Sequence, residues 1–241
     1  MASTQKLFLE DTYLQTFSAH VISVDPQGIQ LSASAFYATS GGQPGDVGIL
    51  TGTHGTTRIT ATQKGKTPDD ILHLPLAGDP LPAPGDIVTG QIDWETRHRH
   101  MRMHTAMHLI CSLITGYATG NQIGTEKSRI DFDIPTGAYD PAELTTRLRH
   151  LIAEDHPISY RWITDDELAA NPSLVRTMSV KPPTGTGRVR LVHIGSPETP
   201  IDLQPCGGTH VRRTGEIGTM TVTKIENKGK QNRRLYLQFG S

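Results

Sequence analysis

A cysteine and a histidine stand four residues apart in "CGGTH", residues 206–210, with two glycines between them. Cysteine thiolate and histidine nitrogen are the ligands that zinc prefers in proteins. Gly207 and Gly208 allow the backbone to fold tightly enough for Cys206 and His210 to face the same point. This pair supplies two of the four ligands of a tetrahedral zinc site, so the other two must come from elsewhere in the chain.

A second pair of imidazoles lies in a segment with helical spacing of its apolar residues. His104 and His108 are four residues apart, which puts them about 40° apart on one face of a helix. Together with Cys206 and His210 they make the four ligands of one zinc ion. Cys111 lies one turn beyond His108 and is either a rival ligand or a small buried residue; its apolar neighbours in "LICSLI" favour burial.

The residue after His104 bears on which kind of bond a zinc site here could hydrolyse. In the helical zinc signature of metalloproteases a glutamate stands there and acts as general base, whereas this chain has Thr105. The missing carboxylate argues against peptide hydrolysis and for an easier leaving group, such as that of an ester. Thr105 lies some 100° around the helix from His104, off the ligand face, so we do not expect it to touch a substrate.

The pattern of apolar residues changes at Asp93, which predicts two domains, 1–92 and 93–241. Residues 17–37 alternate, turn at 25–28 and alternate again, as in a hairpin. A glycine-rich loop follows at residues 39–48, and further short strands are expected at 58–63 and 86–94. Several short strands without a helix predict that residues 1–92 form a small β-barrel.

Residues 93–241 predict an α+β domain. Asp93 caps a helix over about 94–115, and Asp140 with Pro141 and Glu143 starts a second helix. A short polar helix is expected near 165–170. Strands are expected at 158–164, 188–195, 201–205, 217–226 and 233–239, with the last two as a hairpin. The pattern predicts a mostly antiparallel sheet with helices on one side.

Charge and cysteine content set broad limits. The 241 residues carry 23 basic and 24 acidic side chains, a net charge of −1, yet residues 212–241 alone carry a local net charge of +5. This segment is either a phosphate-binding patch or a solvated basic face. Two cysteines argue against a disulfide scaffold, and the chain has neither a signal-peptide start nor a membrane-length apolar run. We therefore expect a cytoplasmic protein without a membrane partner.

The motifs also carry a family resemblance. "MRMHTAMHL" (101–109) together with "CGGTH" (206–210) resembles the two metal motifs of the alanyl-tRNA synthetase editing domain. "RIDFD" (129–133), "GEIG" (215–218) and "KIENKGKQNRR" (224–234) resemble the same domain, and "FYATSGGQPGDVG" (36–48) resembles the glycine motif of the β-domain that precedes it. The likeness covers most of residues 15–241, and the chain resembles the freestanding alanyl-tRNA editing proteins.

This resemblance implies hydrolysis of the ester in mischarged tRNA(Ala), chiefly seryl-tRNA(Ala), assisted by one zinc ion per chain. It leaves open whether glycyl-tRNA(Ala) is accepted and what the oligomeric state is. It implies no use of ATP, because 241 residues leave no room for the synthetase's class II core. Two other readings compete: a structural zinc clip in an RNA-binding module, and a zinc hydrolase of small esters.

The resemblance assigns roles to further residues. Four protein ligands close a zinc site, so His210, at the end of the glycine loop, is expected to be the displaceable ligand with a catalytic role. By offset from His108, Gln122 and Thr125 match polar positions of the family's pocket, although a polar loop is the plain alternative. Contacts to the acceptor end of tRNA(Ala) are expected from the Gly41-Gly42 turn and from six basic residues: Lys127, Arg129, Lys228, Lys230, Arg233 and Arg234.

Overall fold

The computed structural model describes residues 3–67, 69–177 and 187–240. It divides into two compact units, Met1–His98 and Arg99–Ser241. The division falls inside the long helix α1 (Trp94–Leu113), between His98 and Arg99, whereas the sequence pattern changes at residue 93. Among the described residues, no helix has the length and apolar character needed to cross a membrane.

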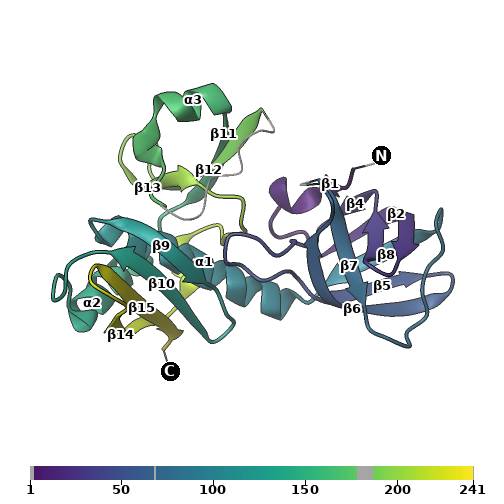
Figure 1. The fold of residues 1–241 in the computed structure, drawn as a ribbon, viewed down its shortest axis with the longest axis horizontal. Helices are drawn as coiled ribbons and strands as arrows, with labels where there is room; N and C mark the ends of the chain where they lie inside the picture. Colours follow the sequence, from purple (N-terminus) through teal and green to yellow (C-terminus); the bar gives the residue numbers. More distant parts are fainter. Residues whose placement is uncertain (1–2, 68, 178–186, 241) are drawn as a thin grey trace. The chain divides into compact units, whose positions relative to one another are not determined.

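The first unit is a closed six-stranded barrel with antiparallel neighbours (Figure 1). Around the barrel the strands follow the order β2 (Thr16–Asp25), β3 (Gly28–Leu31), β7 (Ile71–Pro75), β6 (Gly55–Lys64), β5 (Gly48–Gly52) and β8 (Ile87–Ile92). A short parallel pair, β1 (Gln5–Lys6) with β4 (Ala33–Ser34), and the 3₁₀ turn η1 (Leu7–Leu9) complete the unit. Alternate residues of β2 point inward, where Phe17, Ala19 and Val21 join the core.

A buried histidine is fully hydrogen-bonded inside this barrel. The Nδ1 atom of His73 lies 2.9 Å from Ile29 O, so it carries the proton, and Nε2 lies 2.8 Å from Ser34 Oγ. Burial favours the neutral ring and lowers the pKa of His73 to about 4. His73 is thus a neutral core residue, not a site residue.

The glycine-rich loop of this unit is built on a buried ion pair. Arg97, from the first turns of α1, donates through Nε to both carboxylate oxygens of Asp46 at 2.9 Å, and Asp46 Oδ2 accepts from Tyr37 N at 2.6 Å. At the tip, Ser40 and Gln43 exchange backbone hydrogen bonds across Gly41 and Gly42. Because both central residues have positive φ, +57° and +84°, the turn itself requires glycines.

The second unit contains two antiparallel sheets. The four-stranded sheet has the order β14 (Met220–Asn227), β15 (Asn232–Phe239), β10 (Lys127–Asp133) and β9 (Tyr117–Gln122), and the three-stranded sheet has the order β11 (Ile158–Thr164), β12 (Arg188–Gly195) and β13 (Pro200–Pro205). The predicted hairpin is β14–β15. The α+β class with a barrel at the N-terminal end is confirmed, although the expected single sheet divides into two.

Helices flank these sheets. Asp140 caps α2 (Pro141–Ala153) by accepting from Ala142 N and Glu143 N, as predicted, and Thr164 with Glu167 forms a capping box for α3 (Asp165–Ala170). The 3₁₀ turns η2 (Pro172–Leu174) and η3 (Thr214–Ile217) join the remaining elements. Beyond residue 99, α1 is buried on nearly every side, as expected of a helix at the centre of a domain.

Candidate metal centre

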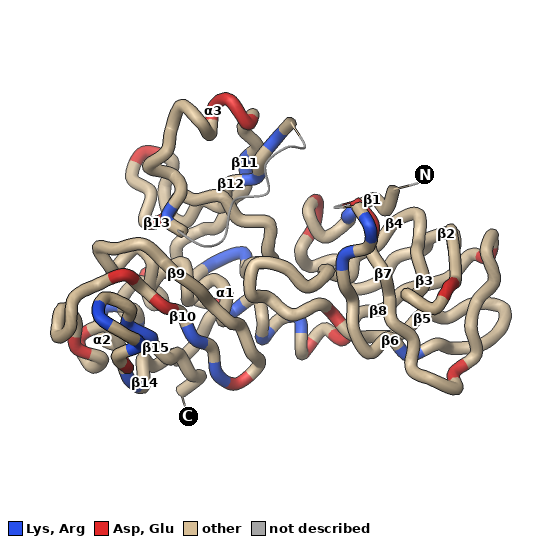
Figure 2. Tube along the Cα trace, in the orientation of Figure 1, with Lys and Arg blue, Asp and Glu red and all other residues tan. Residues whose placement is uncertain are grey.

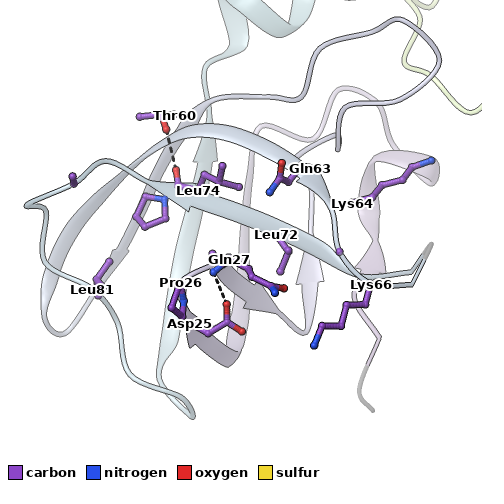
Figure 3. A pocket seen from close by; sticks show the side chains of 14 residues that line it. Asp25, Pro26, Gln27, Thr60, Gln63, Lys64, Lys66, Leu72, Leu74 and Leu81 are labelled. Atoms are coloured by element: carbon purple, nitrogen blue, oxygen red, sulfur yellow. Dashed lines mark hydrogen bonds between the residues drawn. The ribbon is translucent and has the colours of Figure 1, made fainter.

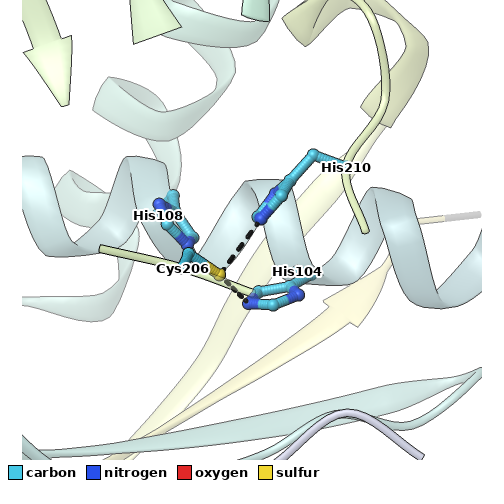
Figure 4. Close-up of side chains that lie close together, drawn as sticks. All are labelled: His104, His108, Cys206 and His210. Atoms are coloured by element: carbon cyan, nitrogen blue, oxygen red, sulfur yellow. Dashed lines mark hydrogen bonds between the residues drawn. The ribbon is translucent and has the colours of Figure 1, made fainter. Parts of the chain in front are cut away.

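The four predicted ligands meet at one point. His104 and His108 come from α1, while Cys206 and His210 come from the loop after β13, and one ligand atom of each lies within 4.8 Å of all the others (Figure 4). Cys206 Sγ is 3.5 Å from His104 Nε2 and 3.4 Å from His210 Nε2. Residues about a hundred positions apart in the sequence therefore form one nitrogen and sulfur donor set.

His108 is oriented by a carboxylate. Its Nδ1 lies 2.7 Å from Asp202 Oδ2, which also accepts from Gln204 Nε2 at 2.8 Å. Because Nδ1 is engaged with Asp202, Nε2 is the nitrogen left to bind a metal. Burial alone would lower the pKa of His108, but its hydrogen bonds with Asp202 and Cys206 raise that pKa to about 10.

His210 is oriented by a hydroxyl. Thr105 Oγ1 donates its proton to Met101 O at 2.9 Å, so it can only accept from His210 Nδ1, 3.2 Å away. The proton on His210 is thereby fixed at Nδ1, and Nε2 keeps its lone pair. Burial and the neighbouring His104 hold the pKa of His210 well below its ordinary value, so the ring is neutral.

Cys206 is poised as a thiolate. Burial by itself would raise the pKa of this thiol, but the nearby imidazoles of His104 and His210 lower it well below the ordinary value. Gly208 N also donates to Sγ at 3.4 Å. Three imidazole rings and a thiolate whose ligand atoms converge are the nitrogen and sulfur donors that zinc prefers, so the donor set fits zinc.

A buried arginine holds the ligand loop in shape. Arg190 of β12 donates through Nε to Cys206 O at 3.1 Å and through Nη2 to Gly208 O, while Cys206 N donates back to Arg190 O at 3.1 Å. Its guanidinium also lies 4.5 Å from the ring centre of Tyr160. The sequence analysis did not single out Arg190, because nothing in "RVRLVHIG" shows that its side chain turns toward a loop sixteen residues later.

Asp202, Gln204 and Thr105 were missed as well. The sequence did contain a signal for two of them, since Asp202 and Gln204 stand four and two residues before Cys206, and an extended chain places residues of this spacing on one face. Thr105 was expected to lie off the ligand face of the helix. It does support a ligand, because His210 approaches from a separate loop.

Cys111 stands outside the four-residue cluster. It is buried, and burial raises the pKa of its thiol to about 12. A neutral thiol in an apolar helix segment behaves as a small core residue. The structure therefore agrees with the burial interpretation over the rival-ligand interpretation.

The two predicted pocket residues lie at the hairpin between β9 and β10. Gln122 ends β9, where its Oε1 accepts from Arg129 Nε at 3.3 Å, and Thr125 is half-buried in the following turn. Their roles in selectivity stay predictions.

The predicted tRNA-contacting residues of the second unit differ in availability. Lys230 is exposed, Lys228 is exposed and pairs with Glu226 at 3.1 Å, and Lys127 lies 4.2 Å from the ring centre of Tyr236. Most of these basic residues lie along β10 and the β14–β15 hairpin, where Figure 2 shows several blue segments.

The remaining arginines already have structural partners. Arg233 is 3% exposed, and its guanidinium donates to Gly229 O and Lys230 O inside the hairpin turn, so we leave it out of the proposed RNA contacts. Arg234 forms two hydrogen bonds with Asp131, at 2.7 and 2.8 Å, and Arg129 shares the same carboxylate at 3.0 Å. Two guanidinium groups on one carboxylate leave this spot with a net positive charge.

A separate depression lies on the barrel unit (Figure 3). Leu72, Leu74 and Leu81 give it apolar walls, and Lys64 and Lys66 lie along its rim. None of the predicted site residues lines it. It therefore does not bear on the candidate metal centre.

Comparisons with known proteins agree with the motifs. Residues 189–236 match the family model described as the threonyl and alanyl tRNA synthetase second additional domain, and residues 3–96 match the model described as tRNA synthetases class II (A). Both ligands of the glycine loop fall inside the first match.

Whole-chain relatives extend this likeness. An alanyl-tRNA editing protein AlaX-M of Methanosarcina acetivorans is 39% identical over 97% of this chain and 98% of its own length, and the protein of the same name from Saccharolobus solfataricus is 31% identical over the same shares. An alanine–tRNA ligase of Pyrobaculum calidifontis is 35% identical over 92% of this chain but only 25% of its own length. Relatives that match along almost their entire length, together with the four converging ligands, show that this chain belongs to the family of alanyl-tRNA editing proteins.

Proposed function

We propose that this protein is a trans-editing hydrolase of the cytoplasm, which deacylates mischarged tRNA(Ala) without using ATP. Its main substrate is seryl-tRNA(Ala), with glycyl-tRNA(Ala) as a second substrate. The observation that carries the proposal is the convergence of His104, His108, Cys206 and His210 in a chain whose relatives are editing proteins. The bond to be cleaved is the ester between the amino acid and the terminal adenosine of the tRNA.

Zinc is the proposed cofactor, one ion per chain, and it would supply Lewis-acid assistance to ester hydrolysis or a binding point for the substrate amine. The protein's own task is to hold the ligands. Asp202 fixes the tautomer of His108 at 2.7 Å, and Thr105 fixes that of His210 at 3.2 Å. An aminoacyl ester needs less activation than an amide, so correct positioning supplies much of the rate.

His210 is the proposed displaceable ligand. A set of four protein ligands normally closes a zinc site, so one ligand has to yield before a substrate group can enter. His210 is supported by a neutral hydroxyl, whereas His108 is supported by a carboxylate. His210→Ala is therefore expected to keep zinc and lose deacylation. Loss of zinc together with activity would leave His210 as an ordinary structural ligand.

Selectivity for serine over alanine is proposed to come from Gln122 and Thr125. A site whose polar group hydrogen-bonds the serine hydroxyl discriminates against alanine, because the group would stay unpaired with the smaller side chain. Thr125→Val keeps the shape and removes the hydroxyl. It is expected to lower the ratio of seryl to alanyl deacylation, measured as kcat/KM.

Binding of the tRNA acceptor end is proposed to use the Gly41-Gly42 turn and five basic residues. These are Lys127, Arg129, Lys228, Lys230 and Arg234. Exposed cations that contact phosphates release counterions, so the affinity should fall as salt rises. The turn's backbone, open at Gly41, allows close approach of a ligand.

One paired assay separates this function from its competitors. Purified protein is incubated with seryl-tRNA(Ala) and, separately, with alanyl-tRNA(Ala), each with and without a metal chelator. The proposal expects chelator-sensitive release of serine and slow release of alanine. An RNA-binding module with a structural zinc clip would bind the tRNA in a salt-dependent way without hydrolysis, and a hydrolase of small esters would show no salt-dependent tRNA binding.

A further inference from the structure

An exposed tryptophan lies on β11, an edge strand of the three-stranded sheet. Trp162 of β11 is 42% exposed, although large aromatic side chains are usually buried. Arg188 of β12 lies over it, with the guanidinium carbon 4.5 Å from the ring centre. The pair places an aromatic ring and a guanidinium group together on β11 and β12, the strands labelled in Figure 1.

This pair is connected to the metal centre by the strand register. Trp162 is the cross-strand partner of Arg190, and Arg190 O accepts from Cys206 N at 3.1 Å. One row of residues thus crosses the sheet from Trp162 through Arg190 to the ligand Cys206. Neighbouring strands are about 4.8 Å apart, so Trp162 starts about 10 Å from the Cys206 backbone.

The side chains of this row share one face of the sheet. Residues directly opposite each other in antiparallel strands project to the same side. Arg190 on that side reaches the carbonyls of Cys206 and Gly208. Trp162 therefore lies on the face of the sheet that carries the metal loop, on the edge strand β11.

The charges around Trp162 are mixed, and a cation lies directly on its ring. On the acidic side, α3 begins with Asp165, Asp166 and Glu167; Asp165 accepts from Gly187 N at 3.2 Å and Glu167 accepts from Thr164 N at 2.7 Å. Arg188 is the exposed cation of β12 beside Trp162, whereas Arg190 is buried and holds the carbonyls of Cys206 and Gly208. An aromatic ring next to guanidinium groups is the combination that single-stranded nucleic acids use, because bases stack on the ring and phosphates pair with the cations.

We propose that Trp162 and Arg188 form a stacking platform for an unpaired base in the single-stranded 3′ end of the aminoacyl-tRNA. This inference rests on the proposed function and deepens it. When the ester lies at the metal centre, the attached nucleosides must extend away from it, and Trp162 lies within their reach, two strand spacings from Cys206 in the same row. Stacking there contributes to binding and positioning of the substrate, not to the bond cleavage itself.

Fluorescence provides a direct test, because the chain has two tryptophans, Trp94 and Trp162. In a Trp94→Phe protein, Trp162 is the sole tryptophan, and a base stacked on it quenches its emission. The probes are uncharged tRNA(Ala) and the same tRNA without its three 3′-terminal nucleotides. We expect quenching by the intact tRNA that is largely lost with the truncated one.

Kinetics provides the second readout. Trp162→Ala is expected to raise KM for seryl-tRNA(Ala) about tenfold with little change in kcat, a factor within the range measured for one base stack. Trp162→Phe keeps an aromatic face and should restore most of the affinity, which a merely structural role for the indole would not predict. Trp94→Phe is the matched control and should behave like the parent protein in the deacylation assay.

The possible outcomes separate the platform from the function. Equal quenching by both tRNAs, or an unchanged KM in Trp162→Ala, overturns the platform while the deacylase proposal stands. If the parent protein releases no serine but the 3′ end still quenches Trp162, the deacylase proposal fails and the platform is supported as an RNA-binding site. If neither quenching nor deacylation is seen, both are refuted.

Discussion

Removal of the carboxylate behind His108 should weaken metal binding without touching a ligand. Asp202 is buried and accepts hydrogen bonds from His108 Nδ1 at 2.7 Å and Gln204 Nε2 at 2.8 Å. In Asp202→Asn an oxygen can still accept from Nδ1, but the negative charge that makes the imidazole more basic is lost. In Asp202→Ala the Nδ1–H group is left without its acceptor.

The expected loss of zinc affinity differs between the two variants, because Asp202→Asn removes only the charge and Asp202→Ala also removes the hydrogen-bond acceptor. Mutation of such outer partners typically weakens metal affinity about 10–100-fold, which corresponds to roughly 1.4–2.7 kcal/mol. We expect Asp202→Asn near the lower end and Asp202→Ala near the upper end. The increasing loss would identify both the charge and the hydrogen bond as contributors.

Competition with a chromophoric chelator measures the zinc affinity of each purified protein, and circular dichroism checks that each remains folded. Asp131→Asn is the matched control, since Asp131 is also a largely buried carboxylate but pairs with Arg129 and Arg234 on the four-stranded sheet. The control should bind zinc as tightly as the parent. Folded Asp202 variants with parental affinity would refute the idea that this carboxylate supports the site.

Three further outcomes are expected. Cys206→Ser should abolish tight zinc binding because the thiolate is lost, whereas Cys111→Ala should keep the zinc affinity and cost about 1 kcal/mol of stability, as measured by urea unfolding. His73 has a pKa of about 4 in the fold against 6.5 when unfolded, so on acidification it stays neutral in the barrel while the unfolded chain takes up a proton. Its contribution to the free energy of unfolding should be fully present above pH 6.5 and should fall by about 3 kcal/mol by pH 4. A parallel decline with pH in His73→Gln would contradict this. Lys230→Ala should reduce the salt dependence of tRNA binding with little change in stability. Arg233→Ala should destabilise the protein by more than about 2 kcal/mol, because its guanidinium is buried and hydrogen-bonded. Equal stability losses in the two variants would show that burial does not distinguish these side chains.

The ligands could be predicted from the sequence because each pair is local. A helix fixes the relation of His104 to His108, and two glycines allow that of Cys206 to His210. The capping residues of α2 could also be predicted from the sequence, since Asp140 and Pro141 act on neighbouring backbone groups. In all these cases the interacting groups lie within about one turn of each other.

Features that depend on distant pairing were not predictable in the same way. The segment "YATGNQ" has neither alternation nor β-branched residues beyond Thr119, yet it forms β9 because β10 supplies its hydrogen-bonding partners. The division into two sheets has the same origin. Strand β10 pairs with β15, a hundred residues later, and amphipathic alternation reveals which face is buried but not which strand lies beside it.

The residues that support the metal ligands arise partly from local strand spacing and partly from contacts between distant segments. Asp202 and Gln204 lie on one side of β13, and Cys206 follows directly after that strand, so a charged support for His108 comes from the segment that also brings the thiolate. His210 enters from beyond the glycines, and its Nδ1 lies 3.2 Å from the hydroxyl of Thr105. A charge-assisted hydrogen bond is roughly twice as strong as a neutral one. The two histidines are therefore held with unequal strength, and this asymmetry is what a four-ligand site requires if one of its ligands is to give way to a substrate.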